Sequence, residues 1–395
     1  MGKLAPIAII ALLIGGLLAA SCTAPSHQDL DQHVRSIAKS HKFSILKWEF
    51  AILLNELRES FVLPTKADIN DAGTVREYFT SIEPDKSLED KAEIILTKQI
   101  RAILAEEGIL NPFLPVKFIF PPLNFKFESP PNLLVISPRD EIRLLRRTTL
   151  DPNLTTKEKG AIESQVDALD VSSLVVGLGG VGFTYPTMIA ESANMRFAID
   201  TAIEEWFHQY MAFRPLGFRY LLDVIGVRSD YDIITMNETV AGIVSKEIGA
   251  KVYQKYYAPE AVPEKEPDSE FNREMRAIRI QVDQYLAQGE IAEAEEFMRE
   301  KRDFLVEKGY YLRKLNQAYF AFHGTYADEP TSVSPIGRDL KELRGQSQSL
   351  KKFLDKVAGM TSYKDLKDAL RNPNNQIPNS NLLMTESPNA HFSHW

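Results

Sequence analysis

The feature that most limits the fold of this 395-residue chain is the recurrence of apolar residues three and four positions apart. That spacing is the period of a helix with one buried face. It occurs in seven segments, at about 33–63, 89–107, 191–213, 231–257, 271–287, 290–322 and 336–371. Two stretches favour extended chain instead: 113–137, which is rich in proline and aromatic residues and contains "NLLVIS", and the region that begins near Ser173. The sequence therefore predicts an α+β fold that is mainly α, with a small β portion directly before the helix at 191–213.

Composition narrows the class of protein. Hydrophobic residues make up 44% of the chain, enough for a substantial core, and the single cysteine excludes a disulfide within one chain. Stability must therefore come from packing. The net charge of −8 and the lack of a basic stripe argue against a nucleic-acid partner.

The N-terminus has the features of a bacterial lipoprotein signal. Lys3 is followed by the apolar run "APIAIIALLIGGLLAA", which has the length of a signal-peptide core and is short for a membrane span. The run leads into "AASC", which resembles a lipobox and places the only cysteine, Cys22, at the position that is lipidated. We expect residues 1–21 to be a signal peptide, 22–32 a tether, 33–371 the folded body and 372–395 a disordered tail. The mature protein would then be lipid-anchored at the cell envelope, outside the cytoplasm.

A short motif, "EEWFHQY", lies in the helix predicted at 191–213. Glu204 and His208 are four residues apart, so they lie on one face of a helix and can share one metal ion. Glu205 lies one step around the helix, near enough to take a proton from water beside that ion. Thirty residues after His208, Glu238 lies in the next predicted helix and would complete a three-ligand site with an open position.

The motifs "EEWFHQY" and "NETVA" together resemble the gluzincin arrangement of thermolysin-type zinc metallopeptidases, with HExxH on one helix and Asn-Glu on the next. The resemblance covers about 173–326, and "LNQAYFAFHGTY" at 315–326 is similar to a segment of bacterial predicted aminopeptidases. It implies a zincin-like domain, a zinc cofactor, and a peptide or protein substrate. It also implies that the β-rich stretch before the helix, with Gly180, Val181 and Gly182, is the edge that holds the peptide.

Two positions depart from that pattern. Glu204 replaces the first histidine, so two carboxylates would neutralise a divalent ion, which makes bound water less acidic and favours harder ions such as Mn²⁺ over zinc. Gly242 stands four residues after Glu238, where the thermolysin pattern often has a supporting aspartate. Three interpretations stay open: an active peptidase with a glutamate ligand, an altered metal site, and an inactive enzyme.

Further catalytic candidates come from the distribution of histidines. Of seven, only His208 and His323 lie in the central body; the other five lie in the expected tether, first helix and tail. His323 lies four residues after Tyr319 and three before Tyr326, and such groups can donate hydrogen bonds to a tetrahedral oxyanion. We expect His323 and Tyr319, or else Tyr326, to have that role. A histidine that merely ends the helix before Gly324 is the structural alternative.

Other interpretations use the same residues. Gly177, Gly179 and Gly182 form a literal GxGxxG, but "FTYPTMIA" follows where a dinucleotide-binding unit needs a helix, so a glycine-rich edge strand fits better. "EWFH" is also the Glu-x-x-His unit of di-iron bundles, which need it twice, whereas the chain has it once. The leading prediction is metal-dependent peptide hydrolysis at the envelope. The alternative is an inactive zincin-like fold that serves as a binding or scaffold module.

Overall fold

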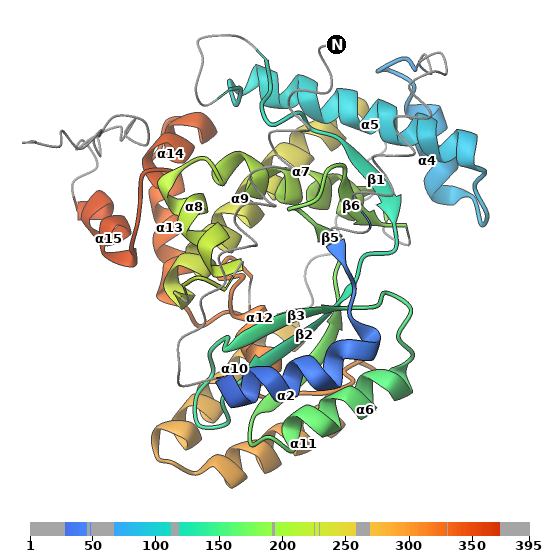
Figure 1. Ribbon diagram of the computed structural model, residues 1–395. Coiled ribbons are helices and arrows are strands. Elements are labelled where there is room, and N and C mark those ends of the chain that lie inside the picture. Colours follow the sequence, from blue (N-terminus) through green and yellow to red (C-terminus); the bar gives the residue numbers. More distant parts are fainter. Residues whose placement is uncertain are drawn as a thin grey trace, which may run out of the picture.

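The computed structural model describes residues 28–45, 48, 67–111, 118–191, 194–224, 226–228, 230–257, 269–329 and 331–371. These ranges are mainly helical and contain two three-stranded sheets (Figure 1), which confirms the predicted α+β, mainly α class. Within them, no helix combines the length and the apolar character that crossing a membrane requires. The expected signal peptide, Cys22 and the tail at 372–395 lie outside the described residues.

The strands in chain order are β1 (Phe125–Glu128), β2 (Asn132–Ser137), β3 (Arg146–Leu150), β4 (Ser172–Gly177), β5 (Gly180–Val181) and β6 (Thr187–Ala190). The first helices are α2 (Gln28–Ala38), α4 (Ala72–Thr80), α5 (Lys86–Glu106), α6 (Thr156–Asp167), α7 (Met195–Met211), α8 (Pro215–Val224) and α9 (Tyr231–Tyr256), with a short 3-10 helix, η2 (Lys39–His41), after α2. The remaining helices are α10 (Ser269–Ala287), α11 (Ile291–Glu307), α12 (Gln317–His323), α13 (Pro335–Gly345), α14 (Leu350–Val357) and α15 (Tyr363–Arg371).

One sheet has β2 at its centre, with β3 and β4 paired antiparallel on either side. All six residues of β2 are buried, because both faces of this strand are covered. Successive side chains of a strand point to opposite faces. Leu134 and Ile136 accordingly join a small core with α2 and α6, whereas Leu133 and Val135 join the main core.

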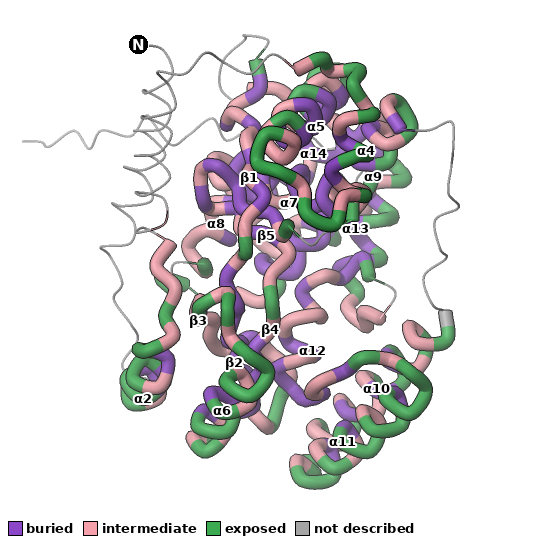
Figure 2. Tube along the Cα trace, turned by 90° about the vertical axis from the view of Figure 1, so that its right-hand side faces the viewer, coloured by how far each residue is buried: buried purple, intermediate pink, exposed green. Residues whose placement is uncertain are grey.

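The second sheet has the order β1-β6-β5, with β1 and β6 parallel and β5 antiparallel at one edge. It lies beside α5 and α7 in the upper half of Figure 1, while the first sheet lies with α2 and α6 in the lower half. Figure 2 shows that the chain is most continuously buried around α7 and the central helices, and most exposed along α6, α10 and α11.

Helices α7 and α9 form the centre of the main core and pack against each other. Each begins with an N-cap that accepts a hydrogen bond from its own first turn: Asn194 from the Phe197 N–H and Asp230 from the Ile233 N–H. Most of their side chains are buried, which fits their weak segregation of apolar and polar faces. The two helices run antiparallel, because His208 meets Glu238 at one end of the pair and Asp200 lies against Gly249 at the other.

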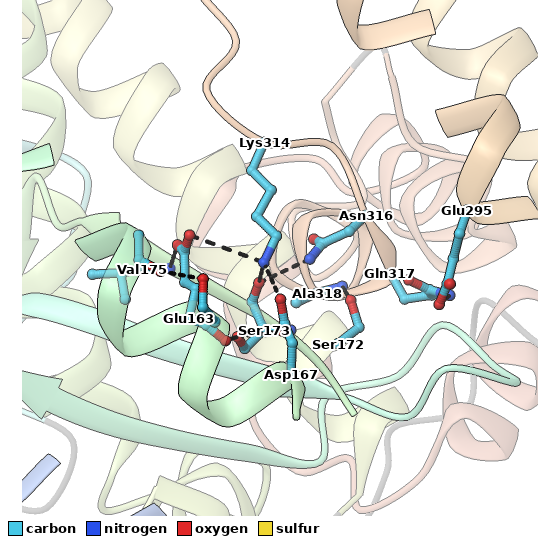
Figure 3. Close-up of polar contacts among 12 residues, drawn as sticks. Glu163, Asp167, Ser172, Ser173, Val175, Glu295, Lys314, Asn316, Gln317 and Ala318 are labelled. Atoms are coloured by element: carbon cyan, nitrogen blue, oxygen red, sulfur yellow. Dashed lines mark hydrogen bonds and ion pairs between the residues drawn. The ribbon is translucent and has the colours of Figure 1, made fainter. Parts of the chain in front are cut away.

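A partly buried ion-pair cluster around the buried Glu163 fixes the segment between α11 and α12 to the first sheet (Figure 3). Arg313 binds both carboxylate oxygens of Glu163, which also accepts the Val175 N–H. Lys314 donates to Asp167 at 2.7 Å. Asn316 donates to the Ser173 carbonyl oxygen, which belongs to β4, at 2.8 Å. This anchor places α12 and the loop after it close to α9.

Three predicted helices are wrong in extent. The segment 33–63 is not one helix: α2 ends at Ala38, and after η2 the chain leaves the helical conformation at Lys42, which bridges to Leu150. The segment 290–322 is not one helix: α11 ends at Glu307, Gly309 takes a positive φ of 93°, and α12 begins only at Gln317. The segment 336–371 divides into α13, α14 and α15, with Ser349 forming a new N-cap for α14. At the N-terminal end, α2 already begins at Gln28, inside the segment expected as a tether.

Candidate metal centre

Glu204, His208 and Glu238 converge between α7 and α9. One ligand atom from each lies within 4.8 Å of the others, and His208 Nε2 is 3.3 Å from Glu238 Oε2. Ligand atoms about 2.1 Å from a tetrahedral ion lie about 3.4 Å apart, so the histidine and Glu238 already have the separation of two ligands. Small rotations of the Glu204 side chain would complete the set. No other group of this kind occurs among the described residues.

His208 is buried, with 5% of its surface exposed, and is held on several sides. The Asn237 amide lies 2.8 Å from its Nδ1, and the Tyr220 ring stacks on the imidazole with ring centres 5.1 Å apart. The Asn237 Oδ1 has no hydrogen-bond partner among the described residues. If the amide turns so that Oδ1 accepts the Nδ1 proton, Nε2 is left with the free electron pair that a metal ligand needs.

Glu238 is the better compensated of the carboxylates. Burial alone would raise its pKa, but His208, a 2.7 Å hydrogen bond from the Tyr220 hydroxyl and the nearby Arg147 guanidinium together lower it. The same pairing acts on His208, where Glu238 outweighs burial and raises the pKa. Arg147 comes from edge strand β3 and is held by Asp223 at 2.9 Å, so the first sheet reaches the metal centre through it.

Glu204 and Glu205 are compensated less: the charge of His208 lowers the pKa of Glu204 and a backbone hydrogen bond from Gly182 lowers that of Glu205, but other effects outweigh both. Both are half-buried, and burial followed by the charge of neighbouring carboxylates raises the pKa of each to about 8. These neighbours are Glu205, Glu238 and Asp328 for Glu204, and Glu238 for Glu205. The site thus gathers more negative than positive charge. A divalent cation is a group that would offset this excess, and the donor set of one imidazole and two carboxylates fits such an ion.

The glycines of the GxGxxG motif have a packing role. A Cβ at Gly182 would lie 2.6 Å from Glu205 Oε2, and one at Gly180 would lie 2.9 Å from the same carboxylate. No helix follows them; Gly180 and Val181 form the edge strand β5, as expected from the strand-forming residues downstream. Gln209 secures the turn by donating to the Gly182 carbonyl oxygen at 2.7 Å. The three residues expected to hold substrate therefore lie directly beside Glu205, and the glycines are required by the close approach of α7.

The catalytic candidates beyond α9 divide into two groups. The pKa of Tyr326 is raised well above its usual value by burial and then by the charges of Glu238, Glu204 and Glu205. Burial alone raises the pKa of Tyr319 to about 12. Burial lowers the pKa of His323 to about 4, with only Glu329 opposing it. The His323 and Tyr319 rings pack on each other with centres 4.2 Å apart, and none of the three carboxylates at 204, 205 and 238 is among the causes of either pKa shift.

Several residues of the centre were not identified from the sequence: Asn237, Tyr220, Arg147 and Asp328. Asn237 carries a signal, since it directly precedes Glu238 in "NETVA". The others come from separate elements, and no spacing in the sequence connects them to the motif. Comparisons with protein-family models, with curated proteins and with solved structures found no match for this chain.

Proposed function

We propose that this protein is a metal-dependent peptide hydrolase with a zincin-like body, held at the cell envelope by a lipid on Cys22. The observation that carries the proposal is the convergence of Glu204, His208 and Glu238 from two buried helices. Glu205, next to this set, supports it further.

A divalent ion bound there, Zn²⁺ or a harder ion such as Mn²⁺, would supply Lewis-acid polarisation of a scissile carbonyl. Glu205 would take the proton of the attacking water, a role that suits a carboxyl whose pKa is raised toward neutrality. The hydroxyl of Tyr326 would donate to the developing oxyanion, because the charges of Glu204, Glu205 and Glu238 act on its pKa, whereas none of them acts on the pKa of Tyr319 or His323. The open edge of β5 would align the peptide backbone.

The first test is the metal content of a soluble fragment that begins at Ser26, which retains every described residue. We expect about one Zn²⁺ or Mn²⁺ per chain after loading. The proposal fails if elemental analysis finds neither ion above the level of a buffer blank.

The second test separates binding from chemistry with Glu205→Gln. Removal of a general base typically costs 10²–10⁴ in rate, so we expect peptide cleavage to fall by about that factor while the metal content stays unchanged. Cleavage that survives the substitution would exclude Glu205 as the base.

One observation favours the second candidate, an inactive zincin-like module that binds a partner. His208 and Glu238 form an ion pair that is satisfied without a metal ion, since each partner also has a further hydrogen bond, from Asn237 or Tyr220. A protein with no metal and no cleavage activity, but with a stable fold, would support this candidate.

A further inference from the structure

The position that faces Glu204 across the helix pair is Gly242. Helices α7 and α9 run antiparallel, with His208 at Glu238 and Asp200 at Gly249. One turn from the His208–Glu238 contact, this register brings Glu204 opposite Gly242. A side chain at 242 would be crowded, because a Cβ there would lie 3.0 Å from both carboxylate oxygens of Asp328, which would have to shift.

Asp328 therefore fills the space that the glycine leaves. Its side chain is 3% exposed, and Oδ2 accepts a 2.6 Å bond from Lys246. Oδ1 is buried and bonds to no other described residue. The backbone is held independently of the carboxylate, since Lys341 donates to the Asp328 carbonyl oxygen at 2.6 Å and the Ala327 N–H donates to Thr239 at 3.0 Å.

The helix register places this carboxylate on the side of α9 that faces Glu204, because Asp328 lies against Gly242. A glutamate has no N–H to offer to Asp328 Oδ1. A metal-binding histidine does, because such a histidine usually donates its second ring N–H to a carboxylate or a carbonyl oxygen.

We propose that Asp328 is a positioning residue for the ligand at position 204, and that it presents an acceptor suited to histidine. The inference rests on the metal centre of the proposed function. The inference adds one element to the proposed metal centre. The loop after α12 supplies a carboxylate that supports the ligand at position 204, whereas α9 has only Gly242 at the corresponding place. With the native glutamate, Asp328 repels the ligand; with histidine, it orients the ring and makes its nitrogen a better donor.

The test is a double-mutant cycle on the full chain, read as Zn²⁺ affinity by competition with a chromophoric chelator. We expect Glu204→His to raise the affinity at least tenfold. In that background Asp328→Asn should lower it by about 10–100-fold, the usual effect of losing such a partner. In the native background Asp328→Asn should not lower it, because no N–H loses its acceptor.

Two further variants test whether the effect on Zn²⁺ affinity is specific to the Asp328 carboxylate. Gly242→Ala, added to Glu204→His, should also lower the affinity, since its Cβ displaces the Asp328 carboxylate while alanine favours the helix. Asp167→Asn is the matched control: Asp167 also pairs with a lysine, Lys314, but lies in the anchor of the first sheet, and it should leave the affinity unchanged. Circular dichroism would verify that each variant is folded.

The inference is overturned if Glu204→His gains no affinity, or if its gain persists in Asp328→Asn. Results that overturn this inference can be distinguished from results that overturn the proposed function. A native protein without metal or activity, whose Glu204→His form binds Zn²⁺ only in the presence of Asp328, would contradict the function and support the inference. An active native enzyme without coupling between positions 204 and 328 would do the reverse.

Discussion

His208 is the candidate ligand whose surroundings leave it the least freedom, because Asn237, Tyr220 and Glu238 all contact its ring. Loss of a partner behind a ligand costs 10–100-fold in metal affinity, so loss of the ligand itself should cost about 100-fold or more. We expect His208→Ala to show this by isothermal titration with Zn²⁺. The matched control is His323→Ala, whose ring packs on Tyr319 away from the carboxylates and which should bind metal as the native protein does. Equal losses in the two variants would contradict the assigned site.

The carboxylates of the centre also predict a pH dependence of stability in the metal-free protein. The pKa values of Glu204 and Glu205 are raised to about 8 from about 4.3 in an unfolded chain. A raised pKa means that the folded state binds the proton more tightly than the unfolded chain does, so protonation of these two carboxyls favours folding. This contribution to the free energy of unfolding is complete below pH 4 and is lost as pH rises through about 8. The raised pKa of His208 acts in the same direction.

We therefore expect the melting temperature in the presence of a chelator to fall between pH 6 and pH 9. Glu204→Gln should flatten this decline, because glutamine cannot ionise. Excess divalent metal should also flatten it, since a bound ion compensates the carboxylates. A native protein that is more stable at pH 9 than at pH 6 would contradict the account.

At the scale of single elements, the contact between β5 and α7 depends on the absence of side chains. Gly182→Ala would place a Cβ 2.7 Å from the Glu205 backbone oxygen and 2.6 Å from its carboxylate. Overpacking of this kind costs about 1–3 kcal/mol, and here it should also displace Glu205 and reduce cleavage. Chemical denaturation would measure the loss. Gly160→Ala is the control: nothing lies within 4 Å of a Cβ there, and alanine inside α6 should add up to about 1 kcal/mol of stability.

The elements differ in how far the sequence predicts them. "NLLVIS" is β2 to the residue, and the helices expected at 191–213 and 231–257 are α7 and α9, because a buried strand and a capped helix carry their own signals. The segment 290–322 was wrongly predicted as one helix because its apolar spacing continues past Glu307. The chain beyond that residue is instead held by ion pairs, from Arg313 to Glu163 and from Lys314 to Asp167. Ion pairs between distant segments have no periodicity.

In the candidate site, too, the sequence predicts what local spacing determines and misses what depends on contacts between distant segments. The proximity of Glu204, His208 and Glu238 was predictable, since two of them lie four residues apart on α7 and the third lies on the next long helix. Tyr220 and Arg147 were not, because their places depend on how α8 and β3 pack around the ligands. The position of the Asp328 carboxylate depends in addition on the space that Gly242 leaves by having no side chain.

At the scale of the whole molecule, α2 belongs to the fold. Val34 and Ala38 are fully buried against the first sheet with Ile162 and Val166 of α6. Removing α2 exposes this apolar surface, and each large side chain involved contributes about 1.5–3 kcal/mol. A fragment that begins at Lys39 should therefore unfold at lower denaturant than one that begins at Ser26. Arg35→Ala, on the exposed face of α2, should leave the unfolding midpoint unchanged, and equal midpoints for the two fragments would show that α2 is dispensable.

The placement of the ligands on two antiparallel helices has a mechanical consequence for a chain that has a single cysteine and so no internal disulfide. An ion held by His208 and Glu238 would act as a cross-link that closes a loop of about 30 residues containing α8 and the start of α9. Because such an ion binds only the folded arrangement, the free energy of unfolding would rise with the logarithm of its free concentration. The resistance of this protein to heat and proteolysis would then depend on the metal supply of its surroundings.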